Sequence, residues 1–318
     1  MQPKSAETGN GTRARVRKLR IDAEEAGQRI DNYLRRMLPG VPKGRIYRIL
    51  RKGEVRVNGG RVKAEYRLAE DDEVRIPPVT VRDEPAPPSG SVVEDIEGRI
   101  LYEDQRLLVV DKPSGVAVHG GSGVSHGVIE RLRAARPACK DLSLAHRLDR
   151  ETSGCLVLAK RRSALRRLHA MFREGQVEKN YFALVLGDWQ HGEVVIDQPL
   201  LVTHRQGGER HVVVSPDGKP ARTTVRLSRR FSNYCLVQCR PETGRTHQIR
   251  VHLACVGHPI AGDTRYGDED ANGHLARMGL KRLFLHAQSI GFPNDSGNEL
   301  LFTAPLPDAL NEFMNEKL

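Results

Sequence analysis

The chain has 318 residues and a formal net charge of +11, which suits two domains and favours a polyanionic partner such as nucleic acid. No apolar run approaches the roughly 18 residues that cross a membrane, and no secretory signal begins the chain, so we expect no membrane partner. Five cysteines, an odd number, argue against a disulfide framework and fit a reducing cytoplasm. Cys235 and Cys239 have no second pair to complete a metal site, so we expect two core thiols and no bound metal.

The first part of the chain divides into a tail and a compact unit. Residues 1–20 are polar and basic without periodicity, which predicts a disordered tail. Residues 28–76 are predicted to form a small α/β unit, because apolar side chains recur at helical spacing over 29–38 and 43–52. The dipeptide Asn58-Gly59 then predicts a hairpin turn, and a short strand closes the unit.

The second of these helices carries basic side chains opposite its apolar positions, with no acidic residue among them. Such a stripe suits contacts with nucleic-acid phosphates, and it is equally compatible with a solvated helix face. The basic residues are Lys43, Arg45, Arg48, Arg51 and Lys52.

The order of these elements resembles a known RNA-binding module. A helix, a basic helix, the string Arg51-Lys-Gly-Glu-Val-Arg-Val-Asn58 and a closing strand are similar to the S4 domain. The resemblance covers residues 28–76 and implies that the five basic residues contact RNA.

A proline-rich linker over 77–98 is predicted to separate this unit from a large domain at 99–318. Strands and helices alternate in the large domain with varied loops, which predicts an α+β fold with a mainly antiparallel, mixed sheet. We expect strands over 99–102, 107–110, 155–159, 180–186, 223–227 and 234–239, and helices over 127–135, 163–173 and 246–256.

A candidate catalytic carboxylate lies in the segment His146-Arg-Leu-Asp-Arg-Glu-Thr-Ser-Gly154. Asp149 is expected on a loop that leads directly into the apolar strand 155–159, where a carboxylate can be held rigidly beside a cleft. A lone aspartate in such a loop is more often a turn or cap residue, so the assignment depends on the whole segment.

Two further segments carry candidate site residues. Glu178-Lys-Asn-Tyr-Phe-Ala-Leu-Val-Leu-Gly187 places Tyr181 in a strand, where a tyrosine more often packs in a core. Pro241-Glu-Thr-Gly-Arg-Thr-His-Gln-Ile-Arg-Val-His252 places Arg250 on a helix, where an arginine is more often a surface charge.

The three segments together, in this order, resemble the signatures of the ribosomal large subunit pseudouridine synthase family. The resemblance implies a pseudouridine synthase fold, with Asp149 as the essential carboxylate and Arg250 as the arginine that pairs with it. It also implies that Tyr181 stacks on the target base and serves as general base, and that Arg147 contacts RNA from which the base has been flipped out. Lys112-Pro-Ser-Gly115 is similar to a further family segment.

The implied reaction converts uridine to pseudouridine in large-subunit (23S) ribosomal RNA, free or in a precursor particle. It breaks the N1–C1′ bond and forms a C5–C1′ bond without redox change, so we expect no cofactor. The carboxylate acts as a nucleophile at C1′, adds to C6 of the base or removes the C2′ proton, and the sequence leaves these routes open. We expect a cytoplasmic monomer.

Two other functions are compatible with parts of the sequence. Gly123-Val-Ser-His-Gly127 fits the pattern of a serine hydrolase with Ser125 as nucleophile and His119-Gly-Gly121 nearby, but no apolar strand leads into the serine. A non-catalytic S4-type RNA-binding or ribosome-assembly factor would explain the small basic unit. It would leave the segments around Asp149, Tyr181 and Arg250 without a purpose.

Overall fold

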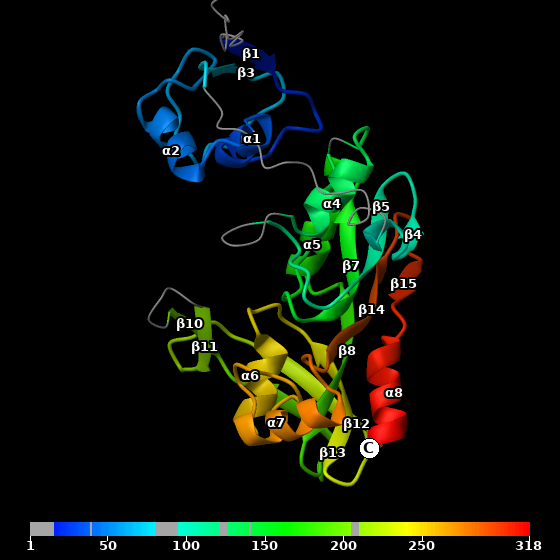
Figure 1. Ribbon diagram of the computed structural model, residues 1–318. Helices are drawn as coiled ribbons and strands as arrows, with labels where there is room; N and C mark the ends of the chain where they lie inside the picture. Colours follow the sequence, from blue (N-terminus) through cyan, green and yellow to red (C-terminus); the bar gives the residue numbers. More distant parts are fainter. Residues whose placement is uncertain (1–15, 39, 80–94, 121–125, 140, 205–209) are drawn as a thin grey trace, which may run out of the picture. The chain divides into compact units, whose positions relative to one another are not determined.

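The computed structural model describes residues 16–38, 40–79, 95–120, 126–139, 141–204 and 210–318 (Figure 1). The chain divides into two compact units, residues 1–86 and 87–318. None of the helices in the described ranges is long and apolar enough to cross a membrane.

The first unit packs two helices against a three-stranded sheet whose order is β1-β3-β2. Ile30 and Leu34 of α1 and Ile46 and Ile49 of α2 are fully buried in one core with Val74 of β3. This confirms the predicted α/β unit with an amphipathic pair of helices. The elements are β1 (Arg17–Arg20), α1 (Ile30–Met37), α2 (Lys43–Arg51), β2 (Arg56–Val57) and β3 (Glu73–Ile76).

The predicted turn at Asn58-Gly59 is confirmed. Both residues have positive φ, 49° and 78°, and Val57 and Gly60 exchange two backbone hydrogen bonds of 3.0 and 2.8 Å. This is the two-residue hairpin in which Asn-Gly is favoured, because its backbone twist matches that of the flanking strands.

The prediction of disorder over 1–20 is wrong for its last residues. Arg17–Arg20 form β1, an antiparallel edge strand on β3. Lys18 pairs with Glu73 at 2.8 Å, and Leu19 packs against the core of the unit. The pairing residues in β3 lie more than fifty positions along the chain, so the local pattern of a polar segment cannot predict the strand. Residues 1–15 lie outside the described part of the chain.

The linker predicted over 77–98 is shorter than expected, because residues at both of its ends belong to the two folded units. Val79 is buried with the core of the first unit, and Ile96 is fully buried in a core of the second. Residues 80–94 lie outside the described part of the chain.

The second unit is built on a ten-stranded sheet in the order β4-β5-β7-β14-β8-β13-β12-β9, with β15 paired to β14 and β6 to β7. Among the described strand pairs, β7 and β14 run parallel and the others antiparallel. The predicted α+β class with a mainly antiparallel, mixed sheet is therefore confirmed. The strands are β4 (Ile100–Glu103), β5 (Leu107–Lys112), β6 (Ser143–Leu144), β7 (Ser153–Ala159), β8 (Glu178–Leu186), β9 (Glu193–Asp197), β12 (Arg222–Arg230), β13 (Tyr234–Pro241), β14 (Leu285–Pro293) and β15 (Glu299–Thr303).

Helices cover this sheet in two groups. Figure 1 shows α4 and α5 beside β7 and β5, and α6, α7 and α8 around the half that contains β12 and β13. A separate hairpin of β10 and β11 projects next to α6 (Figure 1). The elements are α4 (Val128–Ala135), α5 (Arg162–Arg173), α6 (Gln248–Cys255), α7 (Glu269–Met278), α8 (Asp308–Lys317), β10 (Leu200–His204) and β11 (Arg210–Val214).

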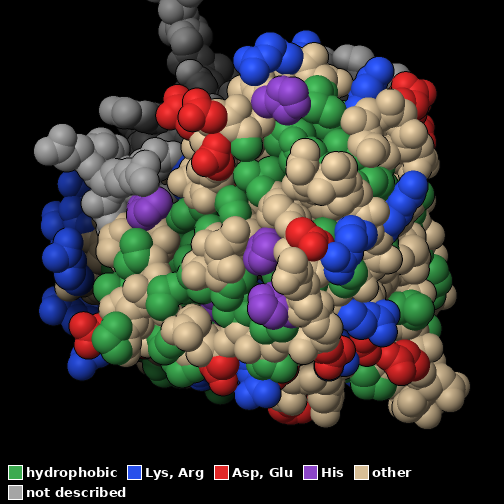
Figure 2. Space-filling view, turned by 90° about the horizontal axis from the view of Figure 1, so that it is seen from below, with side chains coloured by type: hydrophobic (Ala, Val, Ile, Leu, Met, Phe, Trp, Pro, Cys, Tyr) green, Lys and Arg blue, Asp and Glu red, His purple; other side chains and the backbone are tan. Residues whose placement is uncertain are grey.

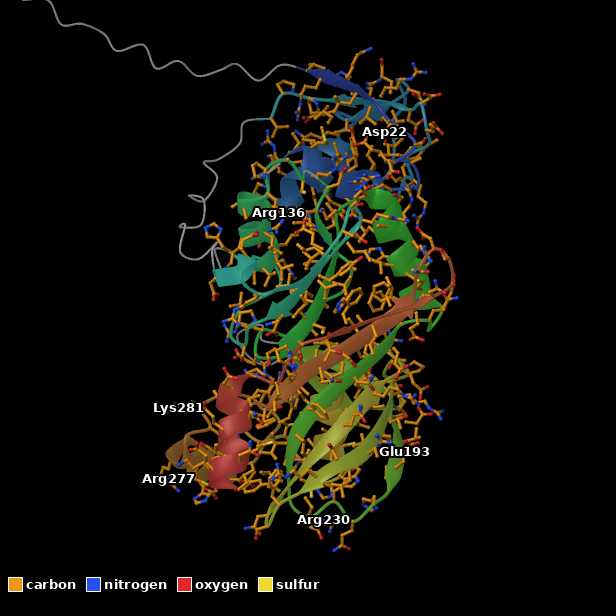
Figure 3. All side chains as sticks on the ribbon, turned by 90° about the vertical axis from the view of Figure 1, so that its right-hand side faces the viewer. Asp22, Arg136, Glu193, Arg230, Arg277 and Lys281 are labelled. Carbon is orange, nitrogen blue, oxygen red and sulfur yellow. The ribbon has the colours of Figure 1, made fainter. Side chains whose placement is uncertain are left out.

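Apolar side chains fill the space between sheet and helices, and most charged side chains lie at the surface. The one tryptophan, Trp189, is fully buried in the core around β8 and β13. Cys235 and Cys239 are fully buried in the same core as free thiols, as predicted. Figure 3 shows Glu193 and Arg230 pointing away from the sheet. In Figure 2, a group of Lys and Arg side chains lies along the left edge of the face, and histidine and apolar side chains lie near its centre among other basic and acidic ones.

Candidate active site

The sheet order brings the three predicted segments together. Asp149 lies in the loop between β6 and β7, Tyr181 lies in β8, and Arg250 lies in α6, which follows β13. Strand β14 separates β7 from β8, and β13 is the other neighbour of β8. All three residues line one cavity of about 330 Å³, together with Arg147. The side chain of Asp149 is 20% exposed, so a substrate in the cavity can reach its carboxylate.

A close approach of two strands fixes the end of the Asp149 loop. Gly154 has φ of +109°, and a β-carbon there would lie 2.2 Å from the carbonyl oxygen of Ala287 on β14. Glycine at this position therefore allows β7 to pair with β14 directly behind the loop.

The segment Lys112–Gly115 holds the same loop from the other side. The ammonium of Lys112 donates to three backbone carbonyls, one of them that of Arg150 at 3.0 Å. The Ser114 hydroxyl donates to the carbonyl of Glu151 at 2.7 Å. Lys112 is fully buried, and burial lowers its pKa to about 7. The residues directly after Asp149 are thus anchored through their backbone.

Arg250 is oriented chiefly by another aspartate. Its Nε and Nη2 donate to the two carboxylate oxygens of Asp263, both at 2.7 Å, whereas its Nη1 lies 4.0 Å from Oδ2 of Asp149. The guanidinium also lies over the ring of Tyr266, 5.1 Å from its centroid. The expected contact between Arg250 and Asp149 is therefore the longer of two, and Asp263 sets the position of the arginine.

Both members of this buried pair are held in their charged forms. Burial disfavours the charge of Arg250, but its bonds to Asp263 outweigh this and raise its pKa. Burial likewise opposes the charge of Asp263, but Arg250 holds the pKa of that carboxyl below its usual range. Such a bidentate pair fixes a guanidinium in one plane.

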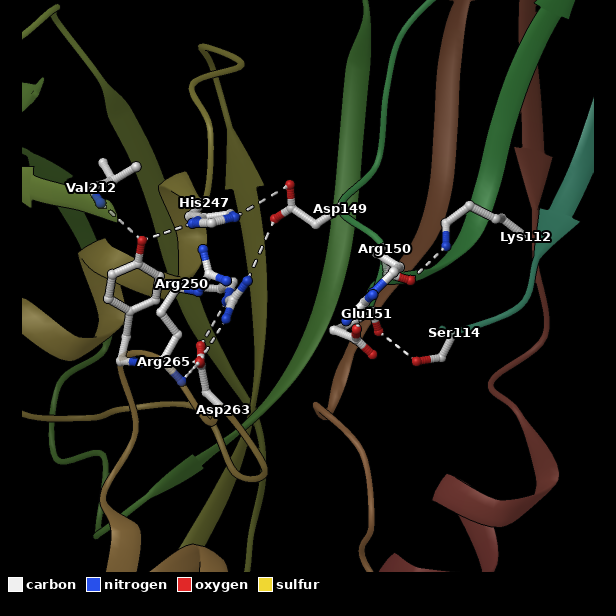
Figure 4. A network of polar contacts seen from close by, with 11 residues as sticks. Lys112, Ser114, Asp149, Arg150, Glu151, Val212, His247, Arg250, Asp263 and Arg265 are labelled. Atoms are coloured by element: carbon white, nitrogen blue, oxygen red, sulfur yellow. Dashed lines mark hydrogen bonds and ion pairs between the residues drawn. The ribbon is translucent and has the colours of Figure 1, made fainter. Parts of the chain in front are cut away.

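The reading of the sequence missed His247 and Tyr266. Nε2 of His247 lies 4.0 Å from Oδ1 of Asp149, and its Nδ1 lies 2.7 Å from the Tyr266 hydroxyl (Figure 4). His247 is inside the recognised segment at 241–252, where its polar ring was a usable signal. Tyr266 and Asp263 lie in a loop with no local pattern that points to the site.

Gln248 fixes the turn that presents His247. Its buried side-chain oxygen accepts from the backbone N–H of Arg245 and from the Thr243 hydroxyl, at 3.0 and 2.7 Å. Its side-chain nitrogen donates to β12, at the carbonyl of Arg222 and the hydroxyl of Thr223, both at 2.9 Å. One amide thus ties the start of α6 to the sheet.

Tyr181 is a weak candidate for a base. Burial raises the pKa of its phenol, and the nearby charge of Asp149 raises it further. The phenol is therefore protonated at neutral pH. Its ring lines the cavity, where it offers a stacking face.

The predicted RNA contacts are exposed. Arg147 lies at the surface, between the cavity of about 330 Å³ and an adjoining one of about 530 Å³. In the first unit, the basic residues of α2 and of its C-cap are all exposed, and none forms an ion pair within the described ranges. These residues are Lys43, Arg45, Arg48, Arg51 and Lys52.

The alternative nucleophile Ser125 lies outside the described residues. Within the described ranges, no group of histidine, cysteine or acidic residues is arranged to hold a metal ion.

Comparison with known proteins identifies the family. The RNA pseudouridylate synthase family profile matches residues 106–255, and the S4 domain profile matches residues 28–74. The chain is 54% identical over 301 residues to ribosomal large subunit pseudouridine synthase C of Salmonella typhimurium, covering 93% of this chain and 94% of the relative. The synthase of the same name from Pasteurella multocida is 53% identical over 303 residues, with 94% and 93% covered.

Solved structures agree with this result. Human RNA pseudouridylate synthase domain containing 4 matches with a TM-score of 0.59 and 28% identity, covering 71% of this chain and 95% of that one. Human RNA pseudouridylate synthase domain containing 1 matches with a TM-score of 0.57 and 27% identity, covering 69% and 85%. The catalytic segments, the fold and these relatives together show that the chain belongs to the RNA pseudouridylate synthase family and carries an N-terminal S4 domain.

Proposed function

We propose that this protein converts uridine to pseudouridine in large-subunit (23S) ribosomal RNA in the cytoplasm, with Asp149 as the catalytic carboxylate. The observation that carries the proposal is the meeting of Asp149, Tyr181 and Arg250 in one cavity of about 330 Å³. The substrate follows from the names of relatives that are 51–54% identical over most of the chain. All named catalytic side chains come from one chain, which fits a monomer.

The reaction moves the ribose C1′ from N1 to C5 of the uracil, and C5 loses one proton. Asp149 attacks C1′, adds to C6 or removes the C2′ proton. In the first and third routes it is ionised again once the C5–C1′ bond has formed, and we assign the removal of the C5 proton to this carboxylate there, because Tyr181 is protonated at neutral pH. In the second route the carboxylate stays bonded to C6 until the C5 proton leaves, so another base must take that proton. Tyr181 then serves as the surface on which the uracil stacks.

The base must leave the RNA stack to reach Asp149, which costs a few kcal/mol in a duplex. Arg147 is exposed and lines the cavity, which supports a role in contacting the RNA from which the base has left. The exposed basic residues of α2 are suited to hold phosphates elsewhere on the same RNA. The substrate is free ribosomal RNA or a precursor particle.

Mapping pseudouridines in cells tests this proposal. A strain that lacks the protein should lose pseudouridine at specific positions of large-subunit RNA, and wild-type protein should restore them. Asp149→Asn should not restore them, although it should accumulate to the same level. Full restoration by Asp149→Asn would show a non-catalytic RNA-binding or assembly role instead.

A further inference from the structure

Nitrogen atoms of two different residues lie near the two oxygens of Asp149. Nη1 of Arg250 lies 4.0 Å from Oδ2, and Nε2 of His247 lies 4.0 Å from Oδ1 (Figure 4). The arginine is itself held by a bidentate bond to Asp263. If His247 also orients the Asp149 carboxylate, another residue must fix the position of its ring.

Tyr266 is the residue that fixes the ring of His247. Its hydroxyl oxygen accepts a hydrogen bond from the backbone N–H of Val212 on β11, at 3.0 Å, and lies 2.7 Å from Nδ1 of His247. The ring of Tyr266 is fixed by stacking on His211 at 5.1 Å and by the guanidinium of Arg250 over it. The hydroxyl is therefore placed by contacts that do not involve Asp149.

The hydrogen-bond pattern selects one tautomer of His247. Because Val212 donates to the Tyr266 oxygen, the phenolic proton is free to point at Nδ1 of His247. The remaining proton of the neutral imidazole is then on Nε2, directed at the Asp149 carboxylate. In the opposite tautomer a lone pair on Nε2 would face that carboxylate, and the phenolic proton would lose its acceptor.

The imidazole is neutral at physiological pH. Burial lowers the pKa of His247, and the charges of Arg250 and Arg265 act in the same direction against the opposing effect of Asp149 and Asp263. Its backbone is also constrained, with φ of +53° at the position that precedes α6. Left-handed backbone at a non-glycine residue is uncommon and persists where surrounding contacts impose it, often at functional sites.

We propose that His247 is a positioning residue, whose Nε2–H orients the Asp149 carboxylate and whose tautomer is set by the Tyr266 hydroxyl. The inference rests on the proposed role of Asp149. Val212 belongs to the β10–β11 hairpin, and its N–H binds the Tyr266 hydroxyl. The position of this hairpin therefore determines the position of the hydroxyl and, through His247, the orientation of the Asp149 carboxylate.

Three variants separate positioning from a general structural role. Tyr266→Phe removes the hydroxyl and keeps the ring. His247→Asn keeps a polar atom near Nδ1 and tolerates positive φ well, but it has nothing at the place of Nε2. His247→Gln carries an amide nitrogen near the place of Nε2, although glutamine is less suited to this backbone. Trp189 fluorescence during urea unfolding reports whether each variant is folded.

We expect Tyr266→Phe and His247→Asn to lower kcat for pseudouridine formation by about 10- to 100-fold with little change in KM, since the carboxylate is displaced rather than lost. His247→Gln should recover part of the kcat that His247→Asn loses. A wild-type kcat in folded His247→Asn, or equal loss in the two His247 variants, would overturn the proposal.

A second measurement does not depend on activity. In protein labelled with ¹⁵N-histidine, the resonances that disappear in His247→Asn identify His247. We expect a protonated Nε2 and an unprotonated Nδ1 in the wild type, and a mixture in Tyr266→Phe. A protonated Nδ1 in the wild type would overturn this inference even if pseudouridine forms. Absence of pseudouridine formation by the wild type, with the expected tautomer present, would contradict the proposed function alone.

Discussion

The buried ammonium of Lys112 and the backbone carbonyl of Arg150 are joined by a hydrogen bond of 3.0 Å, one residue after Asp149. Two further carbonyls, of Pro113 and Val116, accept from the same ammonium at 2.8 and 2.7 Å. One buried lysine therefore binds three backbone carbonyls, one of which belongs to the catalytic loop.

Lys112→Met should lower the free energy of unfolding of the second unit by on the order of 3 kcal/mol. The substitution leaves three carbonyls without their donor, and each unsatisfied buried group costs about 1–3 kcal/mol. Urea unfolding followed by Trp189 fluorescence measures the loss. Lys281→Met, at an exposed position of the same unit, is the matched control and should change little. Equal effects of the two substitutions would contradict the assigned role of Lys112.

Asp263→Asn should cost about 3–5 kcal/mol of unfolding free energy, because it leaves the guanidinium of Arg250 buried without its carboxylate. It should also lower kcat, since Arg250 loses the partner that orients it. Asp268→Asn is the control, because Asp268 caps α7 through Ala271 N–H and asparagine caps equally well. A stable and active Asp263→Asn protein would show that Arg250 does not depend on this pair.

Stability should fall as the pH drops from about 6.5 to about 4. Burial lowers the pKa of His146, His247 and His286 to about 4, whereas an unfolded histidine titrates near 6.5. Between these values the unfolded state binds more protons, so stability is complete above the upper value and is lost toward the lower one. Each histidine contributes up to ~1.4 kcal/mol per pH unit.

Urea midpoints at pH 7, 6 and 5 measure this slope. His286→Gln should reduce this slope, because it removes one of the histidines that bind a proton more readily in the unfolded state. A midpoint that does not change between pH 7 and 5 would refute the assignment of neutral, buried histidines.

The S4 domain should bind RNA through its basic helix. Replacing Arg45, Arg48 and Arg51 with glutamine should weaken binding of ribosomal RNA and reduce the slope of log affinity against log salt by about 2–3, since three phosphate contacts are lost. Replacing Lys18 and Arg20 is the control, because these residues pair with Glu73 and Asp71 in the same unit. Filter binding over a salt series measures both. Identical slopes for the two sets would indicate a solvated helix face.

Local sequence patterns were sufficient for most elements of the fold. The helix expected over 246–256 is α6, but it begins at Gln248 and ends at Cys255, and Val256 is 39% exposed. The chain leaves the helix at Gly257, whose φ of +84° is typical of a residue that terminates a helix. The spacing of apolar residues alone therefore predicted a helix end one residue later than the observed end.

Features that depend on distant partners were not predictable in this way. Strand β1 exists because β3 pairs with it. The site exists because β14 lies between β7, which follows the Asp149 loop, and β8, which carries Tyr181. Asp263 and Tyr266 act on residues of α6 from a loop, so only the folded chain shows their role. The predicted site residues came from whole motifs, since each taken alone has an ordinary structural explanation.

The most direct test of the central claim is the release of tritium from ribosomal RNA that carries tritium at C5 of uridine, offered as a transcript and as a precursor particle. Wild-type protein should release tritium from at least one of these substrates, because C5 exchanges its hydrogen for the bond to C1′. Asp149→Asn should release none while still binding the RNA. Release by Asp149→Asn at the wild-type rate would contradict the account.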